Sequence, residues 1–372
     1  MDFELNDDQQ AVRDLARGIL EKEVTVERLK QLEQERIWDD PALAATLAAA
    51  GLLGIVVPAA HGGMGLGFAE ACVFLQELGR VAARGTFLST VVAALAIARD
   101  GTEAQRCDVL PAVAAGEASL GVALVDAGSS DPATPATRAV RNGRDWILTG
   151  EKRCVAAAAS VRRLLVPART DGATRVFLIA ADAPGVGLAT QRLSTGEPVA
   201  TVTLSGAAAA DDHLLAGADA AVRLHESMRA ALSASQLGAS ERALDMTARY
   251  VRDRIQFGVP IGSFQAVQHR LADCYIDLES MRWTAWRAIE RVAAGRPAGR
   301  ECAVAKFWAA DGGSRIAAAC QHLHGGIGVD LDYPIHRYFL LSKSLELALG
   351  GATAHLVRLG RDLAASGPAE LV

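Results

Sequence analysis

The periodicity of apolar residues changes twice along this 372-residue chain, and this change constrains the fold more than any other feature. Before about residue 118, and again after about residue 217, apolar residues recur at the spacing of an amphipathic helix. The chain between these points consists of short β-type runs separated by turn residues, namely SLGVALV, RDWILTG, RRLLVPA, TRVFLIA and VATVTLSG. The sequence therefore predicts helices, then a sheet, then helices again.

Three domains follow from this order. We expect an N-terminal helical domain over residues 1–117, a middle antiparallel β-domain over residues 118–217 and a C-terminal helical bundle over residues 218–372, which together make an α+β protein. In the first helical run, Asn6 or Asp7 is of a type suited to cap a helix.

The last helical run is interrupted by two adjacent glycines, Gly350 and Gly351. Inside a continuous helix each would cost roughly 1 kcal/mol relative to alanine. We therefore expect the chain to turn there, or to bring its backbone close to a ligand.

Composition excludes several classes of function. The 38 basic and 43 acidic residues give a net charge of -5 without a basic block, so nucleic acid is not an expected partner. The longest apolar stretch, LAAAGLLGIVV, ends before Pro58 and is too short to span a bilayer. The six cysteines are scattered without a C-x-x-C pair, which is typical of reduced thiols in the cytoplasm. We expect a cytoplasmic protein without a membrane span.

Two motifs lack the residues that a phosphate loop or a metal site needs. The glycine-rich segment VVPAAHGGMGLG is not followed by the lysine and Ser/Thr of a phosphate loop. His322 and His324 flank a leucine, but the sequence shows no third metal ligand beside them. We expect no metal site.

Three stretches, taken together and in this order, resemble the acyl-CoA dehydrogenase family. They are LLGIVVPAAHGGMGLGFAEACVFLQELGR, then YVRDRIQFGVPIGSFQAVQHRLADC, and finally QHLHGGIGVDLDYPIHRYF. The second contains the family pattern R-x-x-F-G-x-x-I-x-x-F-Q followed by L-A. The third resembles Q-x-x-G-G-x-G followed by Y-P-x-x-R, with three rather than two residues between Gln321 and Gly325. The resemblance covers essentially the whole chain and implies that the C-terminal helices form a four-helix bundle.

The resemblance also implies a site for FAD that is shared across a subunit interface. Arg254 offers a planar, charged fork that suits a pyrophosphate. Gln256 and Gln265 can donate to phosphate or ribose oxygens, and Phe257 and Phe264 can pack on an aromatic ring. In the family, the counterparts of Arg254 and Gln265 contact the FAD of a neighbouring subunit.

A second group of residues is expected to bind the same cofactor, because glycines let the backbone approach a ligand closely. This group contains Gln321, Gly325, Gly326 and Gly328. The resemblance further implies that Ser130 and Arg229 contact the acyl-CoA substrate.

The family's reaction is the α,β-dehydrogenation of an acyl-CoA thioester, in which a glutamate removes the α-proton while the β-hydride passes to the flavin. The family positions for this glutamate correspond here to Leu349, Met228 and Gln236, none of which can act as a base. Nearby carboxylates are those of Glu226, Glu241 and Glu346. A shift of two residues, however, rotates a side chain by about 200° around a helix.

The β-type region also departs from the family. Members usually carry K-x-W-I-T or K-x-W-I-S, whose aromatic and hydroxyl side chains contact the flavin ring. Here TGEK is followed by Arg153, Cys154, Val155 and Ala156, and the loop from Val125 to Asp131 is shortened and lacks a proline. We expect that the chain's own flavin-ring site is degraded, whereas the segments that reach a neighbour's FAD are intact.

Three hypotheses remain. The first is the subunit without a base in an α2β2 acyl-CoA dehydrogenase, like actinobacterial members of the family that degrade sterols or fatty acids. The second is a homotetrameric acyl-CoA dehydrogenase with a displaced base. The third is a protein of the same fold that binds CoA, or acts as a flavin oxygenase, without dehydrogenase activity. Uneven loss of motifs favours the first, because general decay would have eroded the C-terminal signature too.

Overall fold

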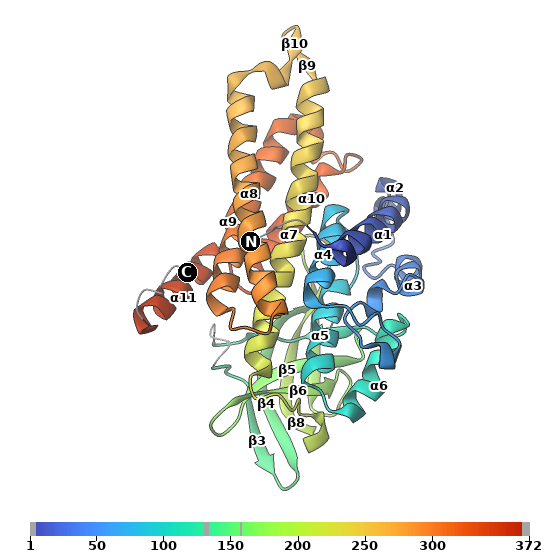
Figure 1. The fold of residues 1–372 in the computed structure, drawn as a ribbon, viewed down its shortest axis with the longest axis vertical. Coiled ribbons are helices and arrows are strands. Elements are labelled where there is room, and N and C mark those ends of the chain that lie inside the picture. The colour runs from blue at the N-terminus through green and yellow to red at the C-terminus, as the bar shows by residue number, and fades with distance from the viewer. Residues whose placement is uncertain (1–4, 130–133, 157, 367–372) are drawn as a thin grey trace. The chain divides into compact units, whose positions relative to one another are not determined.

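The structure, a computed structural model, describes residues 5–129, 134–156 and 158–366. Helices come first, a sheet second and helices last, so the predicted α+β architecture is confirmed (Figure 1). The N-terminal elements are α1 (Asp7–Glu23), α2 (Val26–Gln34), α3 (Pro41–Ala49), η1 (Leu52–Gly54), η2 (Ala59–His61), α4 (Phe68–Arg80), α5 (Phe87–Asp100) and α6 (Glu103–Ala114).

The first helix begins at a capping box. The Asn6 side chain accepts a hydrogen bond from the Gln9 backbone N–H at 2.8 Å, and the Gln9 side chain accepts one from the Asn6 backbone N–H at 3.2 Å. Two of the backbone donors that a helix start leaves without partners are thereby satisfied. Of the two predicted cap residues, Asn6 is the one used.

The middle region forms one sheet. Its strands are β1 (Leu120–Val122), β2 (Val125–Asp126), β3 (Arg138–Asn142), β4 (Asp145–Ala156), β5 (Arg163–Arg169), β6 (Thr174–Ala180), β7 (Val186–Arg192) and β8 (Pro198–Ala209), followed by η3 (Asp211–His213). The order is β1-β5-β3-β4-β8-β7, with β2 on β4 and β6 on β5. Most pairs are antiparallel, as expected, but β1–β5 and β3–β5 are parallel. The chain between β1 and β5 provides the long crossover that a parallel pair requires.

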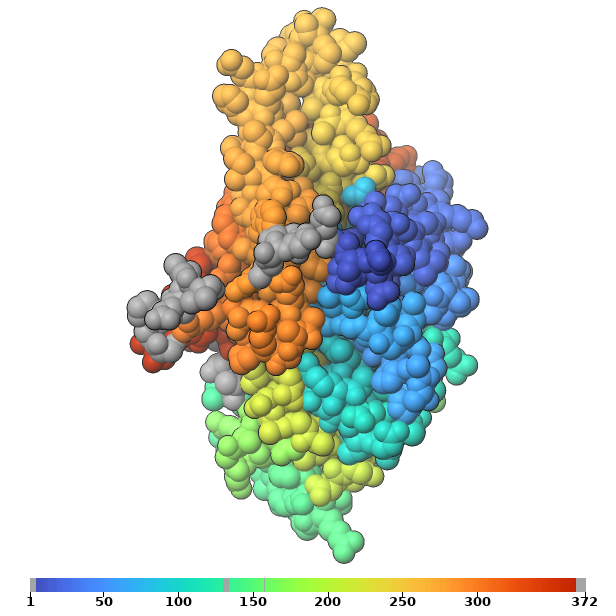
Figure 2. Space-filling model, viewed as in Figure 1, coloured from blue at the N-terminus to red at the C-terminus, as the bar shows by residue number. Residues whose placement is uncertain are grey.

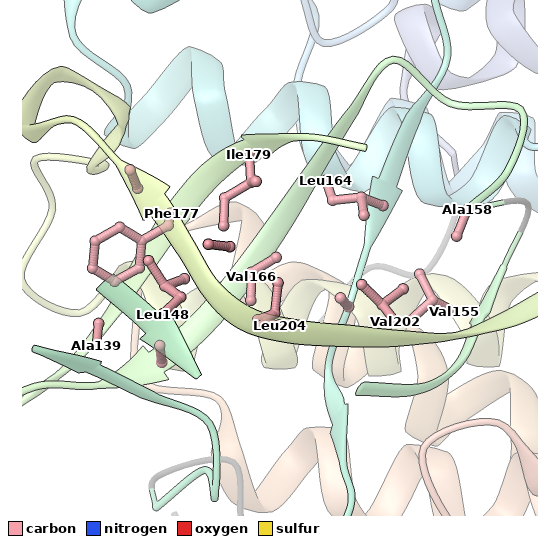
Figure 3. Close-up of a cluster of buried hydrophobic side chains, with 14 of the residues drawn as sticks. Ala139, Leu148, Val155, Ala158, Leu164, Val166, Phe177, Ile179, Val202 and Leu204 are labelled. Carbon is pink, nitrogen blue, oxygen red and sulfur yellow. The ribbon is translucent and has the colours of Figure 1, made fainter. Parts of the chain in front are cut away.

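Alternating apolar residues of these strands form the core of the sheet region. Leu148 of β4, Val166 of β5, Phe177 of β6 and Leu204 of β8 are at most 2% exposed. Figure 3 shows their side chains gathered between the strands. This packing of every second residue explains why the β-type runs were recognisable in the sequence.

The C-terminal region is helical apart from one short hairpin. Its elements are α7 (Ala220–Asp253), β9 (Ile255–Gln256), β10 (Val259–Pro260), η4 (Ile261–Ser263), α8 (Gln265–Ala293), α9 (Gly299–His324), η5 (Gly325–Val329), α10 (Ile335–Leu347) and α11 (Ala352–Ser366). Leu237, Cys274, Ile316 and Tyr338, one from each of α7 to α10, lie in a single buried cluster. Four helices thus share one core, as the bundle prediction requires.

Contacts within the chain group it into two compact units. One contains residues 1–30, 72–83 and 229–372, and the other contains residues 31–71 and 84–228. The predicted domain boundaries at residues 117 and 217 remain predictions. In the part of the chain that the structure describes, no helix is both long and apolar enough to cross a membrane.

Candidate cofactor and active-site elements

A tight hairpin joins α7 to α8 and carries the first group of predicted cofactor residues. Gln256 and Val259 are paired across its strands, and the intervening Phe257 and Gly258 have φ angles of 53° and 79°. Two consecutive residues with positive φ make the kind of two-residue turn that matches the twist of a hairpin. The Phe-Gly of the signature is therefore the turn itself.

The hairpin presents its aromatic and cationic side chains outward. Phe257 is 92% exposed and meets Phe264 edge-to-face at 6.2 Å between ring centroids. Arg254 and Gln265 are also exposed, and their side chains form no hydrogen bond or ion pair with other described residues. In the space-filling view the hairpin forms an exposed end of the α7–α8 helix pair (Figure 2).

The second group of predicted cofactor residues lies where α9 ends. The Gln321 side-chain amide donates a hydrogen bond to the carbonyl of Gly328. Position 328 has no room for a side chain, because a Cβ there would lie 2.9 Å from the Gln321 backbone carbonyl oxygen. Gly325 has a φ of 61°, and beside it and Gly326 the space is open. The Oε1 atom of Gln321 is buried without a hydrogen-bond partner among the described residues.

A stack of rings connects the two groups. Tyr250, four residues before Arg254, stacks on His324, one residue before Gly325, with ring centroids 4.4 Å apart. His324 Nδ1 lies 2.8 Å from the Cys320 carbonyl oxygen and Nε2 lies 3.2 Å from the Tyr333 hydroxyl. Burial lowers the pKa of His324, so its neutral ring donates through Nδ1 and accepts through Nε2.

The expected turn at the glycine pair separates α10 from α11. Leu349, at one of the predicted base positions, has a φ of 58°, and Gly350 has a φ of 100°. The Gly350 N–H donates to the Leu347 carbonyl at 3.0 Å. A non-glycine residue with positive φ is strained, so surrounding contacts must hold this turn in place.

Two buried basic side chains hold the turn. Lys306 is fully buried, and its Nζ donates to the carbonyls of Glu346 at 3.0 Å and Gly350 at 3.4 Å. Burial lowers the pKa of Lys306 to about 7. The negative charge of Glu346 acts to raise this pKa, and the positive charge of Arg229 acts to lower it further. His355 Nε2 also lies 3.0 Å from the Gly350 carbonyl, and burial, with Lys306 nearby, lowers the pKa of His355 to about 3.

The side chains at the other two predicted base positions lie on α7 and are buried. Met228 is 7% exposed and Gln236 is 1% exposed. The Gln236 amide donates to the hydroxyls of Ser240 at 3.1 Å and Ser342 at 3.0 Å. Among the nearby carboxylates, Glu226 is also buried.

The remaining candidate carboxylates are engaged in ion pairs. Glu241 accepts from Arg282 at 2.6 Å and from Gln76 at 3.0 Å. Glu346 accepts from Lys343 at 2.7 Å. Both carboxylates are therefore held by cationic side chains of this chain.

The two predicted substrate contacts come from different parts of the chain. Ser130 lies outside the described residues. Arg229 lies on α7 and is buried, with its charge close enough to Lys306 to lower the pKa of that amine. A role for either residue in binding acyl-CoA stays a prediction.

The shortened loop and the TGEK segment meet in a buried network within the sheet region. Lys152 Nζ lies 2.6 Å from Asp126 Oδ2, and both side chains are almost fully buried. Asp126 Oδ1 accepts from the backbone N–H of Thr137 at 2.8 Å and from its hydroxyl at 2.5 Å. The network joins β2, β4 and the start of β3, so its first role is structural.

The residues that replace the aromatic–hydroxyl pair form a bulge. The β4–β8 register shifts between Lys152 and Val155, and the exposed Cys154 has a φ of 51°. Arg153 forms an ion pair with Glu151 at 2.9 Å. Neither an aromatic ring nor a hydroxyl stands at this point of β4.

Sequence reasoning missed Lys306, His355 and the Tyr250 stack. A signal for Lys306 was present, because Cys302, Ala309 and Ala310, three or four residues away on the same helix face, are all apolar and buried. A lone lysine on such a face predicts a buried amine. The Tyr250 stack has no comparable local signal, because His324 lies on another helix, and His355 meets the Gly350 carbonyl only because the chain turns between α10 and α11.

Family models match both helical ends of the chain. The model "Acyl-CoA dehydrogenase, N-terminal domain" matches residues 6–117, and the model "Acyl-CoA dehydrogenase, C-terminal domain" matches residues 216–363. Among curated relatives, Acyl-CoA dehydrogenase FadE27 of Mycobacterium tuberculosis is 40% identical, over 98% of this chain and 99% of the relative. Acyl-CoA dehydrogenase FadE28 of the same organism is 33% identical, over 97% and 98%.

Two solved structures are similar over nearly the whole chain. A variant of the Tcur3481-Tcur3483 steroid ACAD has a TM-score of 0.91 and 44% identity, covering 96% of this chain and 98% of that one. The ChsE4-ChsE5 complex from Mycobacterium tuberculosis has a TM-score of 0.93 and 39% identity, covering 99% and 100%.

Proposed function

Since this chain belongs to the acyl-CoA dehydrogenase family, we propose that it is the subunit without a catalytic base in a hetero-oligomeric acyl-CoA dehydrogenase. Membership makes it an oxidoreductase of acyl-CoA metabolism. In the proposed enzyme, a carboxylate of a homologous partner subunit removes the α-proton of the thioester. This chain contributes contacts to the cofactor from the Arg254 and Gln321 segments, and it carries an apolar residue at the Leu349 turn.

The turn at Leu349 carries the proposal. Its unusual backbone is retained and is held by Lys306 and His355, although leucine cannot accept a proton. Of the nearby carboxylates, Glu241 and Glu346 are ion-paired. A protein that used Glu241 or Glu346 as a displaced base would need that group to leave its cation and reach the substrate, and the third candidate, Glu226, is buried.

The residues at the two cofactor groups fit FAD. The exposed guanidinium of Arg254, which pairs with no other described residue, suits a pyrophosphate, and Phe257 offers an exposed ring for stacking. Gly325 and Gly326 leave open space for a ligand beside the backbone, and Gln321 has a buried acceptor oxygen in need of a donor. When bound, FAD supplies the acceptor for the β-hydride. We propose that it is shared across a subunit interface, because the first group lies at an exposed end of the α7–α8 pair.

The comparisons support a partner and a substrate class. One similar structure is the ChsE4-ChsE5 complex, and the other is the Tcur3481-Tcur3483 steroid ACAD. We propose an α2β2 assembly with a homologous acyl-CoA dehydrogenase subunit. Its substrate would be the CoA thioester of a steroid or similarly bulky acid.

Co-expression with a homologous subunit encoded beside this chain tests the proposal. We expect the chain alone to hold little FAD and to show no dye reduction with acyl-CoA. The co-purified pair should be a yellow tetramer with fewer FAD than chains, active on bulky acyl-CoA thioesters. A chain that alone carries one FAD per subunit and oxidises acyl-CoA would instead be the homotetramer with a displaced base.

A further inference from the structure

Three side chains of different donor types meet at the start of α6. His61 ends η2, while Glu103 and Cys107 lie one turn apart on the same face of α6. One nitrogen, one oxygen and one sulfur atom of these residues lie within 4.8 Å of one another. All three residues belong to the unit formed by residues 31–71 and 84–228.

Two of the distances between the ligand atoms match those expected around one cation, and in the absence of a cation the Cys107 thiol donates a weak hydrogen bond to Glu103 Oε1. Glu103 Oε1 lies 3.6 Å from His61 Nε2 and 3.6 Å from Cys107 Sγ. The nitrogen–oxygen distance is too long for a good hydrogen bond. Zinc bonds of about 2.0–2.3 Å in tetrahedral geometry separate neighbouring ligand atoms by roughly 3.3–3.7 Å.

The carboxylate of Glu103 is oriented for this role by a neighbour. Its Oε2 atom accepts from Arg106 NH1 at 3.4 Å, which leaves Oε1 directed at His61 and Cys107. Partners that hold the second oxygen of a ligating carboxylate are a regular part of metal sites.

The backbone on both sides is ordered before any ligand binds. The Thr102–Gln105 capping box fixes the first turn of α6, where Glu103 lies. On the other side, Gly63 donates to the Pro58 carbonyl and packs so closely that a Cβ would lie 2.2 Å from the Val57 carbonyl oxygen. The His61 side chain is only 10% exposed. A site on such rigid supports loses little entropy when it binds a metal ion.

We propose that His61, Glu103 and Cys107 bind one Zn²⁺ ion, which fastens the glycine-rich loop after η2 to α6. Mixed nitrogen, oxygen and sulfur ligands suit a borderline divalent cation, and three protein ligands leave one position for water. The site is independent of the proposed subunit role. It replaces the expectation from sequence that the chain has no metal site, and it gives a use to a glycine-rich loop that lacks phosphate-binding residues.

Cobalt can report the site, because a thiolate bound to tetrahedral Co²⁺ gives a charge-transfer band in the near ultraviolet. We would titrate reduced, chelator-treated full-length protein with Co²⁺, record difference spectra against the metal-free sample, and then displace the cobalt with Zn²⁺. The expected result is one Co²⁺ per chain with a thiolate band. Cys107→Ser should abolish the band, and His61→Ala and Glu103→Gln should each weaken Zn²⁺ binding at least ~10-fold.

Cys154→Ser is the matched control, because Cys154 is an exposed free cysteine of the same unit but not of the site. It should keep the band and the Zn²⁺ affinity, and Zn²⁺ should raise the melting temperature of this variant but not of Cys107→Ser. A band that survives Cys107→Ser overturns the proposal. So does Zn²⁺ affinity that is equal in the wild-type protein and in a His61→Ala/Cys107→Ser double variant, since the binding would then be adventitious.

Discussion

Burying a charged lysine costs free energy, and the contacts of Lys306 show which part of the backbone this residue stabilises. Its ammonium group donates to the carbonyls of Glu346 and Gly350, on the two sides of the Leu349 turn. The turn would otherwise relax, because leucine with positive φ is strained. The contacts of Lys306 thus hold the backbone conformation of the turn at which the proposed subunit carries leucine in place of a base.

Replacing Lys306 by methionine should change stability in a pH-dependent way. The folded pKa of about 7 is below the unfolded value of 10.5, so the cost of burying the charge is fully present below pH 7 and fades as the pH rises to 10.5. The stability of Lys306→Met relative to wild type should therefore be greatest near pH 6 and fall by a few kcal/mol by pH 10. Urea unfolding at several pH values measures this. The exposed Lys22→Met serves as control, and a constant difference for Lys306→Met would contradict the shifted pKa.

Introducing a carboxylate at position 349 tests whether the base is all that the chain lacks. Because the bulge at Arg153 and Cys154 offers neither an aromatic ring nor a hydroxyl to a flavin, we expect Leu349→Glu to remain inactive without a partner. Dye reduction with acyl-CoA measures this, and Leu347→Glu, on a 67% exposed residue, is the control. Activity of isolated Leu349→Glu would show that the chain has a complete flavin site.

At the scale of elements, glycines bring α4 and α7 into backbone contact. A Cβ on Gly79 would lie 2.1 Å from the Ser235 carbonyl oxygen, and one on Gly238 would lie 1.9 Å from the Gln76 carbonyl oxygen. Both contacts lie within the unit that contains residues 72–83 and 229–372. The two helices can approach this closely only without side chains at the crossing.

Gly238→Ala should therefore destabilise the protein although alanine is the better helix former. Moving the helices apart to admit the methyl group should cost about 1–3 kcal/mol. Gly360→Ala, in α11 with open space around it, should instead be neutral or stabilise by up to about 1 kcal/mol. Denaturant midpoints compare the two variants, and equal effects would rule out a tight crossing.

At the scale of the whole molecule, the surface that we propose to be buried on assembly is an exposed apolar hairpin beside a cation that pairs with no other described residue. Ile255, Phe257 and Val259 are 60%, 92% and 39% exposed, next to Arg254. Aromatic and arginine side chains are enriched in the buried parts of protein–protein interfaces.

Arg254→Ala should weaken FAD binding in the assembled enzyme without destabilising the isolated chain. A charged hydrogen bond of about 1.5–3 kcal/mol corresponds to roughly a 10- to 100-fold loss of affinity. FAD retained after gel filtration measures binding, and melting of the isolated chain measures stability. Arg252→Ala removes an exposed arginine paired with Asp253 and should retain the cofactor. Equal loss of FAD from both variants would contradict a specific contact of Arg254, because the overall positive charge of the region would then explain the binding.

Much of the fold was predictable from local pattern. Helical periodicity, the Asn6 cap and the break at Gly350 are all properties of neighbouring residues, as is the alternation that places Phe177 and Leu204 in the core. Arg254 and Phe257 could be proposed as site residues because the signature that contains them is continuous in sequence. Lys306 and His355 were missed because their partners lie on other helices or at the turn between them.

The sequence by itself determined the order of helices and strands and the family, and it predicted that the catalytic glutamate is missing, because all of these depend on residue types at short or regular spacing. Only the tertiary structure decided which groups are charged, paired or buried. It buried Lys306 at the turn, paired Glu241 with Arg282, and brought His61 to Glu103 and Cys107. The physical reason is that pKa values, ion pairs and metal sites depend on distances between residues far apart in the chain, and packing sets those distances.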